Sequence, residues 1–136
     1  MCLSGASRAG AELLAALPNV GLRTFYVWVP MKPSDNERAA REASEHFAAA
    51  RAGHYWDRDR HLSRRVATAL DVDTRRSAAA DDDPEFAWDV YLAFRRGEAK
   101  LWQPDFWMHQ LAVEHAPRLE LRGWRTRVEQ LVSEFR

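Results

Sequence analysis

The run Thr24–Val29 (TFYVWV) constrains the fold more than any other segment of the chain. It is dense in β-branched and aromatic side chains without clean alternation, which is typical of a strand buried on both faces of a mostly parallel sheet. A helical pattern lies on each side of it. The first covers Ser7–Leu17 and ends at Pro18, and the second runs from a capping box at Ser34–Glu37 to about Ala50. This order predicts an α/β layer fold.

The alternation of strand and helix continues through the middle of the chain. His54–Trp56 predicts a short strand, and Asp57 or Asp59 is placed to cap a helix that continues to about Leu70. The segment Asp71–Glu85 is polar and has no period, so we expect a surface loop.

The last third predicts a hairpin followed by helices. Phe86–Phe94 is the strongest second strand, and Ala99–Gln103 is expected to return beside it as the antiparallel partner. Pro104–Leu111 is expected to form a short helix, and Trp124–Phe135 has apolar residues at helical spacing. We therefore expect one domain over all 136 residues, with a mixed central sheet covered on both faces in three layers.

Composition excludes several classes of protein. Hydrophobic residues make up 46% and charged residues 29%, which excludes a disordered tail and a disulfide scaffold. The 20 Lys and Arg balance 20 Asp and Glu, so we expect no nucleic-acid partner. The longest apolar run, Phe25–Met31, is too short to span a membrane, and no secretory signal is present, so a cytoplasmic protein is expected. Cys2 is the only cysteine, so no intramolecular disulfide or Cys-based zinc site can form, and we expect neither metal nor cofactor.

Short blocks of the sequence, in the correct order, resemble a bacterial thioredoxin-like family. The matching blocks are Tyr26–Pro30, Ser34–Asn36, His54–Asp57, Trp88–Tyr91 and Phe106–Leu111, and the likeness covers most of the chain from Ser4 to Leu111. The resemblance implies a thioredoxin fold and thiol–disulfide oxidoreductase chemistry, with two cysteines in a C-x-x-C-R loop at a strand-to-helix turn.

The cysteine positions of that loop hold serines here. Aligning Ser7–Gly10 with the family's C-R-x-G places Ser4 and Ser7 at the two positions. A serine hydroxyl cannot form a disulfide and is a feeble nucleophile without a neighbouring base. We therefore expect a degenerate, redox-inactive loop formed by Cys2, Ser4 and Ser7, with Arg8 beside it. A reaction of Cys2 alone with an external small thiol is the alternative.

The sequence also departs from the family at a proline and at a strand. Pro84 is the only candidate for the proline that the family holds in cis, and an ordinary loop proline is the alternative. The family's central strand before the redox turn is missing, which leaves a gap between Thr24–Val29 and Phe86–Phe94. Either these strands pair directly and antiparallel, or a second chain supplies the strand, or the natural protein begins upstream of Met1.

A small set of residues is expected to bind a partner. The candidates are Arg8, Pro84, Trp88, Trp107 and His109. His109 lies among large apolar neighbours and is either a proton donor near a pocket or a half-buried core residue. Asp89, inside the strongest strand, is either paired or at a pocket mouth.

Three kinds of function are compatible with these residues. The first is a divergent, redox-inactive thioredoxin-fold protein that keeps a binding surface. The second is a monothiol oxidoreductase that uses Cys2. The third is an assembly module whose exposed strand edge recruits a protein partner or a second copy of the chain.

Overall fold

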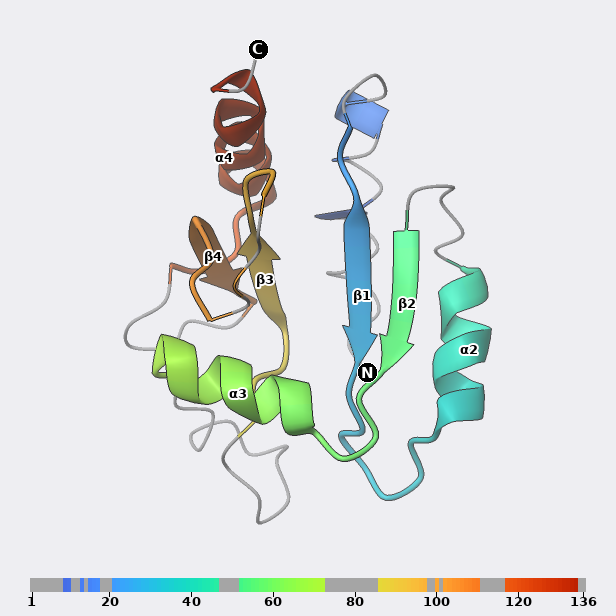
Figure 1. Ribbon diagram of the computed structural model, residues 1–136. Helices are drawn as coiled ribbons and strands as arrows, with labels where there is room; N and C mark the ends of the chain where they lie inside the picture. The colour runs from blue at the N-terminus through green and yellow to red at the C-terminus, as the bar shows by residue number, and fades with distance from the viewer. Residues whose placement is uncertain are drawn as a thin grey trace.

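The computed structural model describes residues 9–10, 13, 15–17, 21–46, 52–72, 86–97, 100, 102–110 and 117–134. Its elements, in chain order, are β1 (Thr24–Trp28), α2 (Glu37–Glu45), β2 (Ala52–Trp56), α3 (His61–Leu70), β3 (Val90–Ala93), β4 (Phe106–His109) and α4 (Leu121–Ser133). The protein is therefore mixed α/β, as predicted (Figure 1). Within the predicted first helix, the described residues Ala9, Gly10, Leu13, Ala15 and Ala16 are helical, and Leu17 is not.

The strands form two small sheets. Strands β1 and β2 are parallel, with Thr24 opposite Ala52, while β3 and β4 are antiparallel, with Val90 opposite His109. Among the described residues no ladder joins β1 to β3, although the two sheets lie side by side (Figure 1). The predicted continuous central sheet, and direct pairing of these two strands, are therefore wrong for this part of the chain. The β1–β2 sheet instead packs against α2, and the β3–β4 hairpin packs against α3 and α4.

The β1–β2 sheet is covered by α2 on one face. Trp28, Ala40 and Ala43 are buried together there, and Tyr26 and Trp56 pack against them. The small alanine side chains allow the helix to approach the aromatic rings of the sheet closely.

Asn36 is the residue that caps the N-terminus of helix α2. The side chain of Asn36 accepts a hydrogen bond of 3.0 Å from the backbone N–H of Ala39. The capping box predicted at Ser34–Glu37 is therefore wrong, because the helix starts at Glu37 and Asn36 is the residue whose side chain reaches its first turn.

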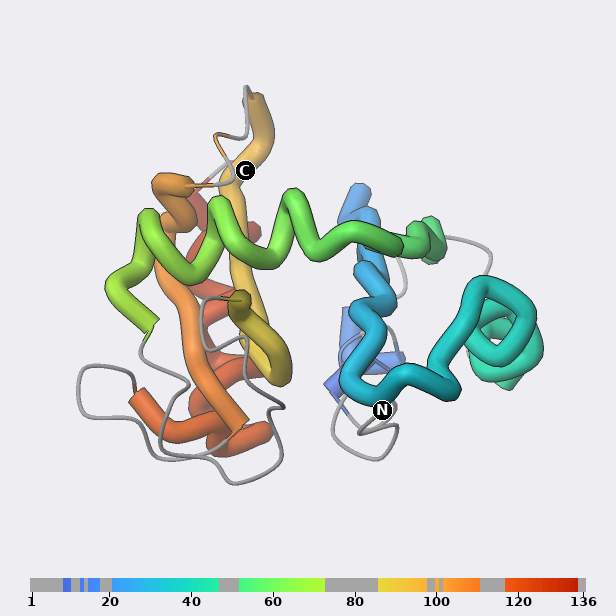
Figure 2. The backbone as a smooth tube through the Cα atoms, turned by 90° about the horizontal axis from the view of Figure 1, so that it is seen from below, coloured from blue at the N-terminus to red at the C-terminus, as the bar shows by residue number. Residues whose placement is uncertain are grey.

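The β3–β4 hairpin lies between two helices. Alternate side chains of β3 point to opposite faces of the hairpin. Val90 and Leu92 pack with α3, in a cluster around Val66 and Ala67. Figure 2 shows α3, in green, extending from the end of β2 across to this hairpin.

The opposite face of the hairpin forms the largest buried cluster. Ala93 packs there with Trp124 and Val128 of α4, and Ala9 and Leu13 of the first helix belong to the same cluster. The first helix, the hairpin and α4 therefore share one core. In the described part, no helix combines the length and apolar character needed to cross a bilayer.

The partner strand of the hairpin differs from the prediction. Asp105 closes the loop between the strands: its N–H donates to the carbonyl of Ala93 over 2.9 Å, and its carboxylate accepts from the N–H of Arg95 over 2.6 Å and pairs with the Arg95 side chain. These bonds start β4 at Phe106. The strand predicted at Ala99–Gln103, as far as it is described, and the helix predicted at Pro104–Leu111 are therefore wrong.

Candidate functional site

The predicted redox loop lies outside the described residues. This applies to Cys2, Ser4, Ser7 and Arg8, and also to Pro84 and to most of the predicted loop at 71–85. Val72, at the start of that loop, is described and is buried rather than on the surface.

Two of the predicted binding residues lie together at the base of the hairpin. His109, at the end of β4, is 1% exposed, and its ring meets that of Trp88 edge-on with centroids 5.7 Å apart. Its backbone N–H donates to the carbonyl of Pro117 over 3.0 Å, and its carbonyl accepts from the N–H of Leu119 over 2.7 Å. The segment around Arg118 therefore fixes His109 from the outer edge of β4.

Trp107 occupies the same face of β4, two residues before His109. It lies opposite Leu92 and is half-buried. Trp88, Trp107 and His109 thus belong to the side of the hairpin that α3 covers. With His109 nearly inaccessible, they are placed to build the core rather than to meet a ligand.

Asp89 connects this cluster to the start of β3. Its φ of 54° is left-handed, an uncommon conformation that aspartate tolerates better than most residues. Its carbonyl accepts from the N–H of Gln110 over 2.9 Å, and the Gln110 side chain accepts from the Tyr91 hydroxyl over 3.2 Å. Burial raises the pKa of the Asp89 carboxyl, and the charge of nearby His109 opposes that rise.

We predict that Asp89→Asn stabilises the protein at neutral pH. In the folded protein the pKa of Asp89 is raised above its ordinary value of 3.8, so ionisation of the carboxyl destabilises the fold. This destabilisation is absent at pH values below 3.8 and is complete at pH values above the raised pKa. Asparagine keeps the shape and tolerates the left-handed backbone. Thermal melts of both proteins over a pH series should show a higher midpoint for the variant at neutral pH. The difference should shrink as the solution is acidified, and a lower midpoint at neutral pH would mean that attraction to His109 outweighs burial.

A different surface is open to solvent. On the β1–β2 face away from α2, Phe25 is 59%, Val27 38% and Tyr55 57% exposed. The rings of Phe25 and Tyr55 lie 6.2 Å apart and lean over Gly53, where an added Cβ would lie 3.0 Å from the first ring and 3.2 Å from the second. We call these four residues the exposed β1–β2 face. The prediction that Thr24–Val29 is buried on both faces is wrong, because α2 covers one face only.

Comparison with protein-family models, with curated proteins and with solved structures finds no match. Within the described ranges, no three or more His, Cys, Asp or Glu side chains are grouped so as to hold a metal ion. We therefore base the function on the geometry of the exposed β1–β2 face.

Proposed function

We propose that this chain is a divergent, redox-inactive thioredoxin-like module that binds a second copy of itself through the exposed β1–β2 face. Cys2 supports the first half of the proposal, since these 136 residues hold no second cysteine with which it could form a dithiol. The order of the elements is compatible with such an architecture. In the chain, α2 connects the parallel strands β1 and β2, and α4 follows the hairpin β3–β4.

The observation that carries the assembly role is the exposure of three large apolar side chains on one sheet. Phe25, Val27 and Tyr55 are contiguous there, and clustered exposed apolar groups mark interaction surfaces more often than scattered ones do. Aromatic rings contribute strongly to such contacts because they bury a large area for few rotatable bonds.

A second copy is the occupant that the charge of the chain favours. The net charge is zero and the isoelectric point is about 7.0, so two copies do not repel one another near neutral pH. A twofold axis would stack the two exposed faces as sheets stack in a sandwich, about 10 Å apart. Because the face has only two short strands, the dimer is weak and reversible.

Sedimentation velocity across a wide range of protein concentration tests this proposal. The wild-type protein should pass from monomer to dimer as concentration rises. Phe25→Lys places a charge in the centre of the interface and should weaken association at least about tenfold. Trp102→Lys is the matched control, since Trp102 is 51% exposed on the β3–β4 loop, and it should dimerise normally.

Three results would contradict the proposal. A wild-type protein that remains monomeric at the highest concentration rules out self-assembly. Normal dimerisation of Phe25→Lys, with an unchanged circular dichroism spectrum, moves the interface elsewhere. Disulfide reductase activity that disappears in Cys2→Ser would contradict the redox-inactive half and favour the monothiol enzyme.

A further inference from the structure

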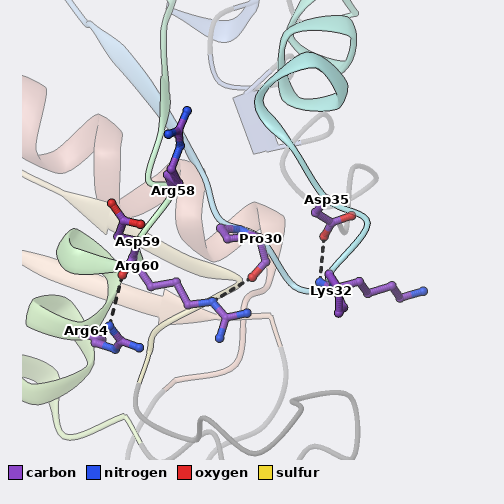
Figure 3. Close-up of a pocket in the computed structure, with 8 residues that line it drawn as sticks. Pro30, Lys32, Asp35, Arg58, Asp59, Arg60 and Arg64 are labelled. Carbon is purple, nitrogen blue, oxygen red and sulfur yellow. Dashed lines mark hydrogen bonds between the residues drawn. The ribbon is translucent and has the colours of Figure 1, made fainter.

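A basic pocket opens where β1 and β2 end. It is a solvent-open cavity of about 330 Å³, bounded by the loop that follows β1 and the turn that precedes α3 (Figure 3). Its charged lining residues are Lys32, Asp35, Arg58, Asp59, Arg60 and Arg64. Among the residues that the structure describes, four cationic side chains and two acidic ones thus line the pocket, in a chain whose net charge is zero.

Arg60 and Arg64 have fixed positions in this pocket. Arg60 Nε donates to the carbonyl of Pro30 over 3.0 Å, and its guanidinium lies 4.1 Å from the centre of the Phe86 ring. Arg64 Nη1 donates to the carbonyl of Asp59 over 3.2 Å. These contacts orient the two guanidinium groups along one wall, as Figure 3 shows.

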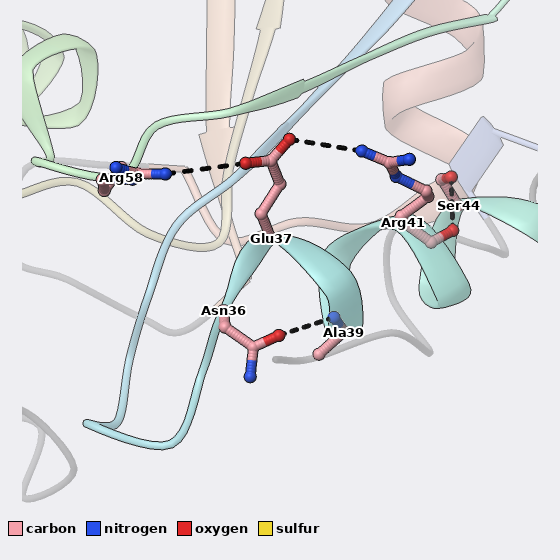
Figure 4. Close-up of polar contacts among 6 residues, drawn as sticks. All are labelled: Asn36, Glu37, Ala39, Arg41, Ser44 and Arg58. Atoms are coloured by element: carbon pink, nitrogen blue, oxygen red, sulfur yellow. Dashed lines mark hydrogen bonds and ion pairs between the residues drawn. The ribbon is translucent and has the colours of Figure 1, made fainter.

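Two acidic side chains in or near the pocket, Asp35 and Glu37, have local contacts. Asp35 Oδ2 accepts from the N–H of Met31 over 2.8 Å and from that of Lys32 over 3.1 Å. Glu37 is shared between two arginines (Figure 4): one oxygen lies 3.4 Å from Arg41 Nη2 and the other 3.7 Å from Arg58 Nη2. Within the described residues, Arg58 makes one ion pair, and it is this long contact at the rim of the pocket.

The helix ends beside the pocket already have partners. Asn36 accepts from the first turn of α2 (Figure 4). Asp57 accepts from the N–H of Leu62 over 3.3 Å and of Ser63 over 2.9 Å in α3. An anion in the pocket would therefore be held by cationic side chains rather than by helix N-termini.

We infer that the basic pocket binds the phosphate group of a small molecule. In α/β proteins, ligands bind beyond the carboxyl ends of parallel strands, which is where this pocket lies. Guanidinium groups match the oxygens of phosphate and an ammonium adds a point charge. The volume is at the lower end of the range of about 300 to 1,000 Å³ typical of small-molecule sites. The cationic side chains are gathered in one pocket of a chain with no net charge, and they do not form a stripe along the surface. This arrangement favours a small ligand over nucleic acid.

Titration with inorganic phosphate, followed by amide chemical shifts at constant ionic strength, tests the site. Amide resonances of Met31, Lys32, Ser34 and Asp35 and of residues 58–64 should move and saturate with phosphate, and chloride should not reproduce the shifts. The variant Lys32→Gln/Arg58→Gln removes two exposed cations without touching the contacts of Arg60 and Arg64. It should weaken phosphate binding about tenfold or more.

A second double variant controls for net charge. Arg38→Gln/Arg125→Gln also removes two cations, each from an exposed ion pair within one helix, and it should bind phosphate as the wild type does. Equal shifts with chloride, or shifts in the wild type that avoid the two segments, would mean an adventitious ion only. Unchanged affinity in Lys32→Gln/Arg58→Gln would also overturn the inference. Phe25→Lys should retain binding, which separates this result from self-association.

Discussion

Trp124→Ala should lower the free energy of unfolding by about 4 kcal/mol, a large part of the roughly 5 to 15 kcal/mol that stabilises a typical domain. Trp124 is 7% exposed and is the largest side chain in the core that joins α4 to the hairpin. Its ring meets those of Phe106, with centroids 4.9 Å apart, and Tyr91, 5.9 Å apart. Alanine would leave a cavity that neighbouring rings cannot fill, since strands β3 and β4 hold their positions.

Chemical denaturation followed by circular dichroism measures this effect. Trp102→Ala is the control, because a tryptophan that is 51% exposed should cost less than about 1 kcal/mol. Trp124→Phe should recover part of the loss by filling some of the space. Equal effects of the Trp124 and Trp102 substitutions to alanine would contradict the assigned core.

Gly10→Ala should destabilise the protein by about 2 kcal/mol, through overpacking rather than loss of contact. A Cβ at Gly10 would lie 3.1 Å from Cζ of Tyr26 and still closer to its hydroxyl oxygen. Tyr26 cannot easily turn away, because its ring is stacked on those of His54, with centroids 4.9 Å apart, and Trp28, 6.2 Å apart.

The phenol oxygen provides an internal test of this clash. Tyr26→Phe removes the closest atom, so Gly10→Ala should cost much less in the Tyr26→Phe background than in the wild type. Gly21→Ala is the control, since nothing lies within 4 Å of its added Cβ. If the two costs of Gly10→Ala were equal, the first helix would not pack against β1 through this pair.

Local signals predicted much of the fold. The β-branched and aromatic density of Thr24–Val29 predicted β1, which ends one residue earlier. Asp57 or Asp59 was expected to cap the following helix, and the Asp57 carboxylate does so. Apolar spacing predicted a helix at Trp124–Phe135, and α4 begins three residues before that range at Leu121, where the Glu120 side chain accepts from two of its N–H groups.

Features that depend on distant partners were not predictable. Phe106–His109 reads equally well as helix or strand, and the bonds of Asp105 to Ala93 and Arg95 decide in favour of a strand. Phe25 and Val27 are as apolar as Trp28, so no pattern distinguishes the open face of β1 from the covered one. The core role of His109 follows from its burial, which the sequence does not show. That burial depends on α3 and on the 117–119 segment, which lie far from His109 in the sequence or are joined to it only in the folded structure.

The basic pocket was not predictable from the sequence for a related reason. Lys32 and Arg58 are far apart in the chain, and each belongs to a stretch of mixed charge. They become neighbours because parallel strands end at the same edge of their sheet. Pairing of β1 with β2, rather than any motif, creates the site.

Arg60 has a mechanical consequence for the molecule. One side chain hydrogen-bonds the loop after β1 at Pro30, stacks on Phe86 ahead of β3, and forms part of the pocket wall. The carbonyl of Ser63, in α3, accepts a hydrogen bond from the N–H of Ala87 over 3.0 Å, so α3 also contacts the segment that precedes β3. Arg60 therefore connects the segment after β1 with the segment before β3, so an anion bound to its guanidinium would contact a residue that links the two sheets.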